Sequence, residues 1–145
     1  MDEFDFWVGE WEVYAGDKLA GVNRIEKLHD GAVIVENWTG TSGATGISLN
    51  FYDPALGKWR QTYVANDRTI WEMTGECRDG AMRFEGDLIF ADGNLKKTRV
   101  TFYNLERDRL RHTEDNSSDG GQTWVSVWDA IYSRIMVSGK TPLPG

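Results

Sequence analysis

The chain has 145 residues and a formal net charge of -7 at pH 7, from 16 basic and 23 acidic side chains. This length favours one domain whose core is large enough to fold without a metal or a disulfide. The acidic balance argues against a nucleic-acid partner, because neutralising phosphates requires a basic patch and the sequence contains none. Cys77 is the single cysteine, so an intrachain disulfide is excluded.

No stretch approaches the roughly 20 apolar residues of a membrane-spanning helix, so we expect no membrane partner. Residues 1–6 are acidic and are not followed by a long apolar run, which argues against a secretory signal. We therefore expect a cytoplasmic protein.

Short runs of alternating polar and apolar residues, separated by Gly, Asp and Asn, predict about ten strands. In chain order these runs cover residues 8–14, 21–28, 32–38, 46–52, 59–64, 69–76, 81–90, 97–105, 110–114 and 124–136. Such regular spacing of turn signals is typical of an antiparallel barrel or sandwich, and closure into a barrel would remove the exposed strand edges.

The ends of the chain differ from this pattern. Residues 2–7 predict a short helix that plugs one end of the barrel, whereas residues 138–145 contain two of the three prolines and predict a flexible tail. The fold class we expect is therefore all-β, with a single closed antiparallel barrel domain over residues 1–137. Seven Trp, five Tyr and six Phe are enough to line or fill such a barrel.

One pair of motifs connects the two ends of the predicted barrel. Gly9-Glu10-Trp11 opens the first strand and Arg134 lies near the end of the last. In a closed barrel these strands are neighbours, so the guanidinium group can stack on the indole. In this the chain resembles the calycin superfamily, which includes the lipocalins.

Longer motifs extend the resemblance over nearly the whole chain. They are similar to an uncharacterised, largely bacterial family of lipocalin-like domains, and they cover residues 4–11, 36–38, 48–53, 58–64 and 118–124. The resemblance implies a calycin-like barrel of about ten strands. It implies no particular activity, because that family has none agreed.

Residues 117–124 also match the Asp-box pattern Ser-x-Asp-x-Gly-x-Thr-Trp. The Ser and Asp oxygens of this pattern accept backbone N–H bonds in a tight turn, and the Gly adopts a positive φ. A sialidase-type propeller needs repeated copies, and this chain has one. We therefore predict a structural hairpin turn here.

Alternation places polar and aromatic side chains on common strand faces. The same-face pairs are Glu36 and Trp38, Asn50 and Tyr52, Gln61 and Tyr63, Arg99 and Tyr103, His112 and Glu114, and Trp124 and Trp128. If these faces point inward, aromatic walls surround a few polar groups, as in a small-ligand site. The candidate ligand-binding residues are Trp38, Asn50, Gln61, Tyr63, Arg99, Tyr103, His112 and Trp128. The alternative is a filled barrel whose polar groups satisfy one another, and one bulge would reverse the faces.

Glu36, Glu72 and Glu114 are the carboxylates that lie within apolar runs. A buried Glu against an aromatic wall has a raised pKa and can transfer a proton at neutral pH. Such a residue on the outer face needs no functional explanation. A Glu paired with Arg99 would favour binding, whereas an unpaired buried Glu beside space for a substrate would favour catalysis.

We expect no metal or cofactor. Zinc needs about four ligands, and the sequence has no cluster of His and Cys. Haem-binding calycin relatives use a histidine as the iron ligand, so haem would bind at His112 if it bound at all.

These observations lead to ranked interpretations. The first is non-covalent binding of a small apolar or aromatic molecule with a polar handle inside the barrel. The second is a cofactor-free isomerase, cyclase, lyase or hydrolase that uses Glu36 or Glu114 in the same cavity. The third is a filled barrel that acts through its outer surface as a homodimer.

Overall fold

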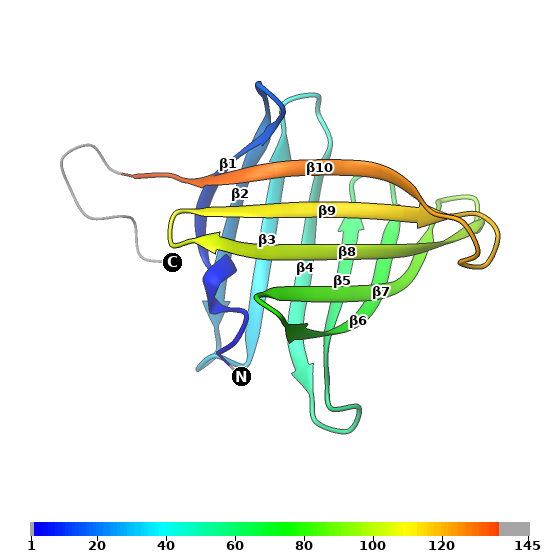
Figure 1. Ribbon diagram of the computed structural model, residues 1–145, viewed down its shortest axis with the longest axis horizontal. Coiled ribbons are helices and arrows are strands. Elements are labelled where there is room, and N and C mark those ends of the chain that lie inside the picture. Colours follow the sequence, from blue (N-terminus) through cyan, green and yellow to red (C-terminus); the bar gives the residue numbers. More distant parts are fainter. Residues whose placement is uncertain (1, 137–145) are drawn as a thin grey trace.

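The structure is a computed structural model that describes residues 2–136. A single 3-10 turn, η1 (Asp5–Trp7), precedes ten strands (Figure 1). The strands are β1 (Gly9–Ala15), β2 (Lys18–Leu28), β3 (Val33–Gly40), β4 (Thr45–Asp53), β5 (Lys58–Ala65), β6 (Ile70–Arg78), β7 (Ala81–Ile89), β8 (Leu95–Glu106), β9 (Arg109–Ser117) and β10 (Val125–Arg134). The tail predicted for residues 138–145 lies outside the described residues.

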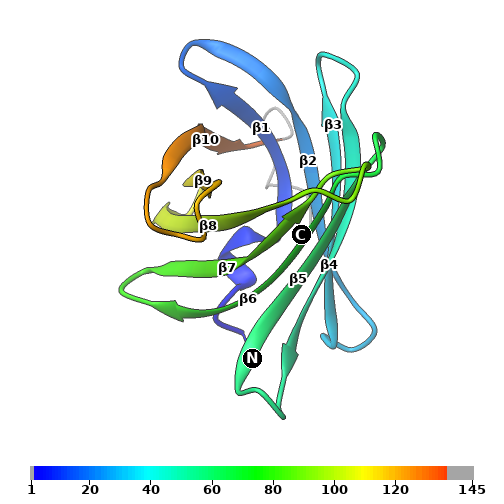
Figure 2. The same cartoon turned by 90° about the vertical axis from the view of Figure 1, so that its right-hand side faces the viewer.

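Every strand pairs antiparallel with its neighbours in sequence, and β1 also pairs with β10, so the sheet closes into a barrel (Figures 1 and 2). The predicted all-β closed antiparallel barrel of about ten strands is confirmed. Strand ends differ by a few residues from the sequence patterns. For example, β2 begins at Lys18 instead of residue 21. A register shift interrupts its alternation, because Gly21 lies opposite Val13 whereas Leu19, two residues earlier, lies opposite Tyr14.

The helix expected over residues 2–7 is a 3-10 turn of three residues. Its backbone bonds run from Asp5 to Asp2, from Trp7 to Phe4 and from Val8 to Asp5, which is 3-10 geometry. Phe4 and Trp7 are fully buried. The Phe4 ring lies 4.7 Å from the Trp7 ring and 5.4 Å from that of Phe102 in β8, so this segment packs into one end of the barrel (Figure 2).

The closing pair of strands carries the predicted contact between Trp11 and Arg134. The two residues are directly opposite in the β1–β10 register, and the Arg134 guanidinium lies 4.2 Å from the centre of the Trp11 ring. Its Nη1 donates to the Val8 carbonyl at 2.8 Å, and its Nη2 donates to the Arg107 carbonyl at 2.9 Å. The predicted cation–π contact is confirmed, and it connects β1, β10 and the β8–β9 turn.

The Asp-box residues form the expected turn between β9 and β10. The Asp119 carboxylate accepts bonds from the Thr123 hydroxyl, from the backbone N–H groups of Thr123 at 2.9 Å and Gln122 at 3.0 Å, and from the Ser117 hydroxyl. These bonds, the one from the Thr123 hydroxyl most of all, hold its pKa well below the usual range. Gly121 has a φ of 97°, which favours glycine. The Trp124 indole closes the turn by donating to the Gly121 carbonyl at 3.1 Å.

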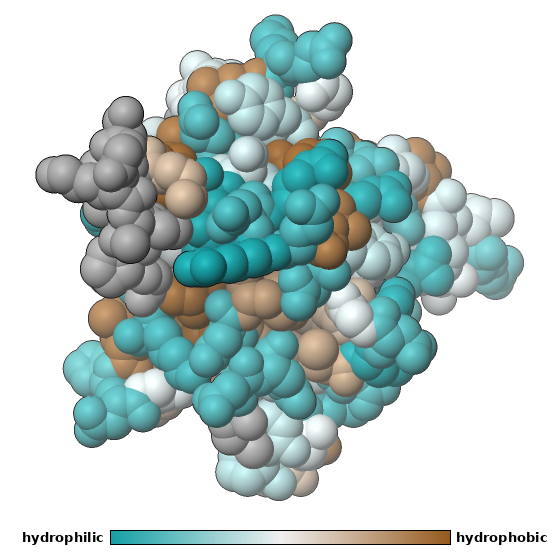
Figure 3. Space-filling view, turned by 60° about the vertical axis from the view of Figure 1, so that its left-hand side comes forward, coloured by the Kyte–Doolittle hydropathy of each residue, from teal (hydrophilic) through white to brown (hydrophobic). Residues whose placement is uncertain are grey.

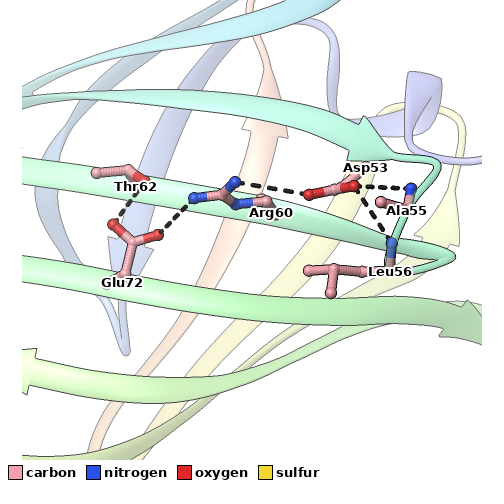
Figure 4. Close-up of polar contacts among 6 residues, drawn as sticks. All are labelled: Asp53, Ala55, Leu56, Arg60, Thr62 and Glu72. Atoms are coloured by element: carbon pink, nitrogen blue, oxygen red, sulfur yellow. Dashed lines mark hydrogen bonds and ion pairs between the residues drawn. The ribbon is translucent and has the colours of Figure 1, made fainter.

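The outer face of the barrel is mainly polar. The side of the molecule seen in Figure 3 is mostly hydrophilic, with apolar residues gathered in a few small areas. On the outer faces of β4 to β6, Arg60 lies between Asp53 and Glu72, while Thr62 donates to Glu72 at 2.8 Å (Figure 4). Glu72 is thus an outer-face carboxylate with a surface ion pair. Within residues 2–136, no helix is long and apolar enough to cross a membrane.

Candidate functional site

A cavity of about 610 Å³ occupies the half of the barrel away from η1. Inward side chains of β3, β5, β6, β8, β9 and β10 line it, and it reaches the barrel end formed by the β1–β2, β3–β4 and β5–β6 turns. Its floor consists of Met73, Val100 and Phe102, which belong to the buried core below. A volume of this size is typical of a site for one small organic molecule.

Glycines beside two of the rings keep the cavity open. A Cβ at Gly21 in β2 would clash with the Trp38 ring, and a Cβ at Gly46 in β4 would clash with the Tyr63 ring. Both rings therefore lie close against the wall of the barrel, where an ordinary residue would push them toward its axis. The aromatic residues line this part of the barrel instead of filling it.

The aromatic wall consists of two edge-to-face pairs. Trp38 of β3 meets Trp128 of β10 with ring centres 6.4 Å apart, and Tyr63 of β5 meets Trp71 of β6 at 5.2 Å. All four rings line the cavity. Edge-to-face contacts of this kind stabilise the positions of the rings beyond the effect of burial alone.

A buried polar chain runs along one side of the cavity from β2 to β5. Glu36 accepts bonds on both carboxylate oxygens, from the Asn23 amide at 2.8 Å and from the Ser48 hydroxyl at 2.7 Å. Asn50 in turn donates to Ser48 at 2.8 Å, and Gln61 donates to Asn50 at 2.5 Å. Burial raises the pKa of Glu36, and the two hydrogen bonds oppose that shift only in part.

The opposite side of the cavity carries His112 and Glu114, both from β9. The His112 ring stacks on Phe102 at 4.3 Å, and its Nδ1 accepts a bond from the Trp128 indole N–H at 3.1 Å. That bond assigns the single ring proton to Nε2. Burial lowers the pKa of His112 to about 3, so the imidazole is neutral at pH 7.

Glu114 is held from across the barrel. One of its oxygens accepts a bond from the Trp71 indole N–H at 3.2 Å, although β6 and β9 are separated by two strands. In the sheet, Glu114 lies directly opposite Trp128. Burial raises the pKa of Glu114.

The structure places most of the predicted site residues at the cavity. Trp38, Gln61, Tyr63, His112 and Trp128 line it, together with Glu36 and Glu114. Asn50 is fully buried behind this lining, where it accepts the bond from Gln61.

Arg99 and Tyr103 require a correction, because both lie on the outer face of the barrel. The Arg99 guanidinium lies 3.8 Å from the centre of the Trp124 ring and 3.9 Å from Asp115, and the Tyr103 ring receives the guanidinium of Arg111 at 5.5 Å. The inward residues of β8 are Thr98, Val100 and Phe102, all buried. Alternation in β8 was therefore predicted correctly, but the choice of the inward face was wrong. In the part of the chain that the structure describes, no arginine lines the cavity.

Four residues that shape the site were not predicted from the sequence: Asn23, Ser48, Trp71 and Tyr132. The Tyr132 hydroxyl accepts a bond from Asn23 at 2.9 Å, and burial raises the Tyr132 pKa well above its usual value. Alternation carries a signal for two of them, since Asn23 shares a face with Ile25, and Ser48 with Asn50. Across residues 2–136, no group of three His, Cys, Asp or Glu side chains is placed to hold a metal ion.

The sequence matches no protein-family model, and comparison with curated proteins finds no match. The class of protein is therefore defined by its fold and its site. It is a closed ten-stranded antiparallel β-barrel with an internal cavity that has aromatic walls and buried carboxyl groups.

Proposed function

We propose that the protein is a lipocalin-like binding domain that holds one small apolar or aromatic molecule, with a polar handle, inside the barrel. The observation that carries this proposal is the cavity of about 610 Å³, which glycines keep open beside its aromatic walls. A barrel that acted only through its outer surface would gain stability by filling this space, because empty volume forfeits packing contacts.

The contact between Trp11 and Arg134 supports the lipocalin-like assignment. A stack of a late arginine on the tryptophan of the first strand is the feature that the chain shares with the calycins, and here the Arg134 guanidinium lies 4.2 Å from the centre of the Trp11 ring. The same contact lies at the η1 end of β1, away from the cavity, so it closes the barrel without occupying the site.

The two sides of the cavity have different roles in this proposal. The rings of Trp38, Tyr63, Trp71 and Trp128 bury the flat apolar part of the ligand, since apolar area removed from water contributes about 25 cal/mol per Å². Gln61, His112 and the carboxyl groups then orient its polar end.

Native mass spectrometry of freshly purified protein, repeated after denaturation, tests whether a small molecule is carried along. Binding of the neutral dye N-phenyl-1-naphthylamine provides a second readout that does not depend on the identity of the natural ligand. We expect one dye molecule to bind per chain with increased fluorescence. Trp38→Ala should weaken this binding by removing part of the wall.

A matched pair of variants distinguishes dye binding in the lumen from dye binding on the outer surface. Ala65 lines the cavity, whereas the adjacent Val64 points outward and is 41% exposed. Ala65→Phe should narrow the mouth of the cavity and weaken dye binding, and Val64→Phe should leave dye binding unchanged. Equal binding by both variants, with folded circular-dichroism spectra, would contradict binding inside the barrel.

A second candidate function is proton-transfer catalysis in the same cavity. The specific observation is that Arg99 lies outside, so neither Glu36 nor Glu114 has an arginine partner. The raised pKa of each carboxyl group suits a general acid or base in an isomerase, cyclase, lyase or hydrolase.

Incubating any co-purified molecule with fresh protein, followed by mass spectrometry, tests this second candidate. Catalysis predicts a product that Glu36→Gln or Glu114→Gln no longer forms while binding persists. If the native protein leaves the co-purified molecule unchanged, that result would count against catalysis.

A further inference from the structure

The cavity contains more acidic than basic groups. Its lining includes the carboxyl groups of Glu36, Asp67 and Glu114, and within residues 2–136 Lys18 is the single ammonium group of the lining. Lys18 begins β2 at the β1–β2 turn, where it is exposed to solvent. His112 adds no positive charge, because its Nδ1 accepts the Trp128 bond and its pKa is about 3. Among residues 2–136, no ion pair includes Glu36 or Glu114.

The carboxyl groups of Glu36 and Glu114 are not equivalent. Both oxygens of Glu36 accept protein hydrogen bonds, and only 6% of this residue is exposed. Glu114 accepts a bond from Trp71, the Asn116 side chain adds a weaker hydrogen-bonding contact, and Glu114 is only partly buried. It is also closer than His112 to the β9–β10 turn, at the end of the barrel where the cavity opens. Glu114 is therefore the carboxyl group better placed to meet a ligand.

Indole rings flank Glu114 on two sides. Trp128 is its direct cross-strand neighbour, and Trp71 reaches it from across the barrel. Trp38 packs on Trp128 and Tyr63 packs on Trp71, so four rings surround the space beside the carboxyl group. The faces of such rings carry negative charge density and attract cations, including organic ammonium groups.

A carboxylate in a partly desolvated site is costly unless a proton or a cation compensates it. A ligand that supplies the cation gains both the ion pair and the ring contacts. A ligand with a carboxylate is repelled by the same groups. We propose that the polar handle of the ligand is an organic ammonium group, bound by Glu114 between the indoles of Trp71 and Trp128. This inference rests on the proposed binding function.

Three probes with one ring system and different handles test the proposal by isothermal titration calorimetry at pH 7: 2-(1-naphthyl)ethylamine, 2-(1-naphthyl)ethanol and 1-naphthylacetate. The amine is protonated at this pH, since alkylammonium groups have a pKa near 10. We expect the amine to bind on the order of tenfold more tightly than the alcohol, and the carboxylate to bind most weakly.

Isosteric variants test whether the preference for the amine depends on the Glu114 carboxyl group. Glu114→Gln should remove the preference for the amine over the alcohol while leaving the affinity for the alcohol within about twofold. Glu72→Gln is the matched control, because Glu72 is an outer-face carboxylate paired with Arg60 and Thr62. This control should retain the full preference for the amine.

The outcomes distinguish this inference from the proposed function. If the alcohol or the carboxylate binds as tightly as the amine, or if Glu114→Gln retains the preference, the ammonium assignment is wrong although the cavity binds ligands. If neither the three probes nor N-phenyl-1-naphthylamine binds, both the proposed function and this inference fail.

Discussion

Replacing Arg134 should destabilise the barrel far more than replacing an exposed arginine. Its side chain is 12% exposed and donates to the carbonyls of Val8 and Arg107 while stacking on Trp11. A hydrogen bond to a charged group contributes about 1.5–3 kcal/mol, and a cation–π contact about 0.5–2 kcal/mol. Water can replace the bond at the exposed Arg107 carbonyl, so we count one bond and the stack. Arg134→Ala should then lower the free energy of unfolding by about 2–5 kcal/mol.

Urea unfolding followed by tryptophan fluorescence and circular dichroism measures this loss. Arg134→Lys keeps the positive charge but removes the planar guanidinium group and its several N–H donors. It should lose about half as much stability as Arg134→Ala. Arg111→Ala is the control: Arg111 bonds Asp129 at 2.7 and 2.9 Å, but both side chains are about half exposed. Such a surface pair contributes about 0–1 kcal/mol. If Arg134→Ala and Arg111→Ala cost the same, the closing contact has no special role and the reasoning is refuted.

Three further predictions concern the interior and the β9–β10 turn. Because the pKa of His112 is about 3 in the fold and 6.5 in a free side chain, stability should be lost as the pH falls from 6.5 to 3. His112→Gln should flatten this dependence in acid-unfolding curves, and an unchanged curve would contradict the assignment. Gly46→Ala should push the Tyr63 ring into the cavity and weaken N-phenyl-1-naphthylamine binding severalfold, whereas full dye affinity would show that the glycine is not needed. Asp119→Ala should speed amide hydrogen exchange at Gln122 and Thr123 without unfolding the barrel, and unchanged exchange there would argue against the turn's dependence on this carboxylate.

Local patterns were enough to predict the barrel. Each strand pairs with its neighbour in sequence, so alternation and turn residues carry almost all the topology. The Asp-box turn at Asp119 was predictable for the same reason, since its bonds join residues at most four positions apart. The contact between Trp11 and Arg134 was predictable from closure alone, because closure makes the first and last strands neighbours.

The inward face of a strand was harder to predict than the strand itself. In β8 the residues of either face could line a barrel interior: Arg99 and Tyr103 lie on one face, and Val100 and Phe102 lie on the other. A bulge between Ser126 and Trp128 breaks the alternation of β10, and this shift is not visible in the residue pattern. Trp124 consequently packs under Arg99 on the outer face and does not share the cavity with Trp128.

Contacts across the lumen could not be predicted from the sequence, for a different physical reason. Trp71 bonds Glu114 although their strands are not paired, so no register links the two residues. Whether rings line a barrel or fill it depends on the space beside them. That space is set here by Gly21 and Gly46, which in the sequence resemble ordinary strand interruptions.

The closing pair of strands also determines the order in which the protein can fold. Nine of the ten strand pairings join neighbours in sequence and form over short loops, whereas the Arg134–Val8 bond joins residues 126 positions apart. Closing so long a loop costs entropy and slows folding, so the β1–β10 seam is expected to form last. Until then β1 and β10 each present an unpaired edge to other chains. During synthesis β1 must wait until β10 has emerged before it meets its partner, and in that interval the protein is most exposed to misassembly.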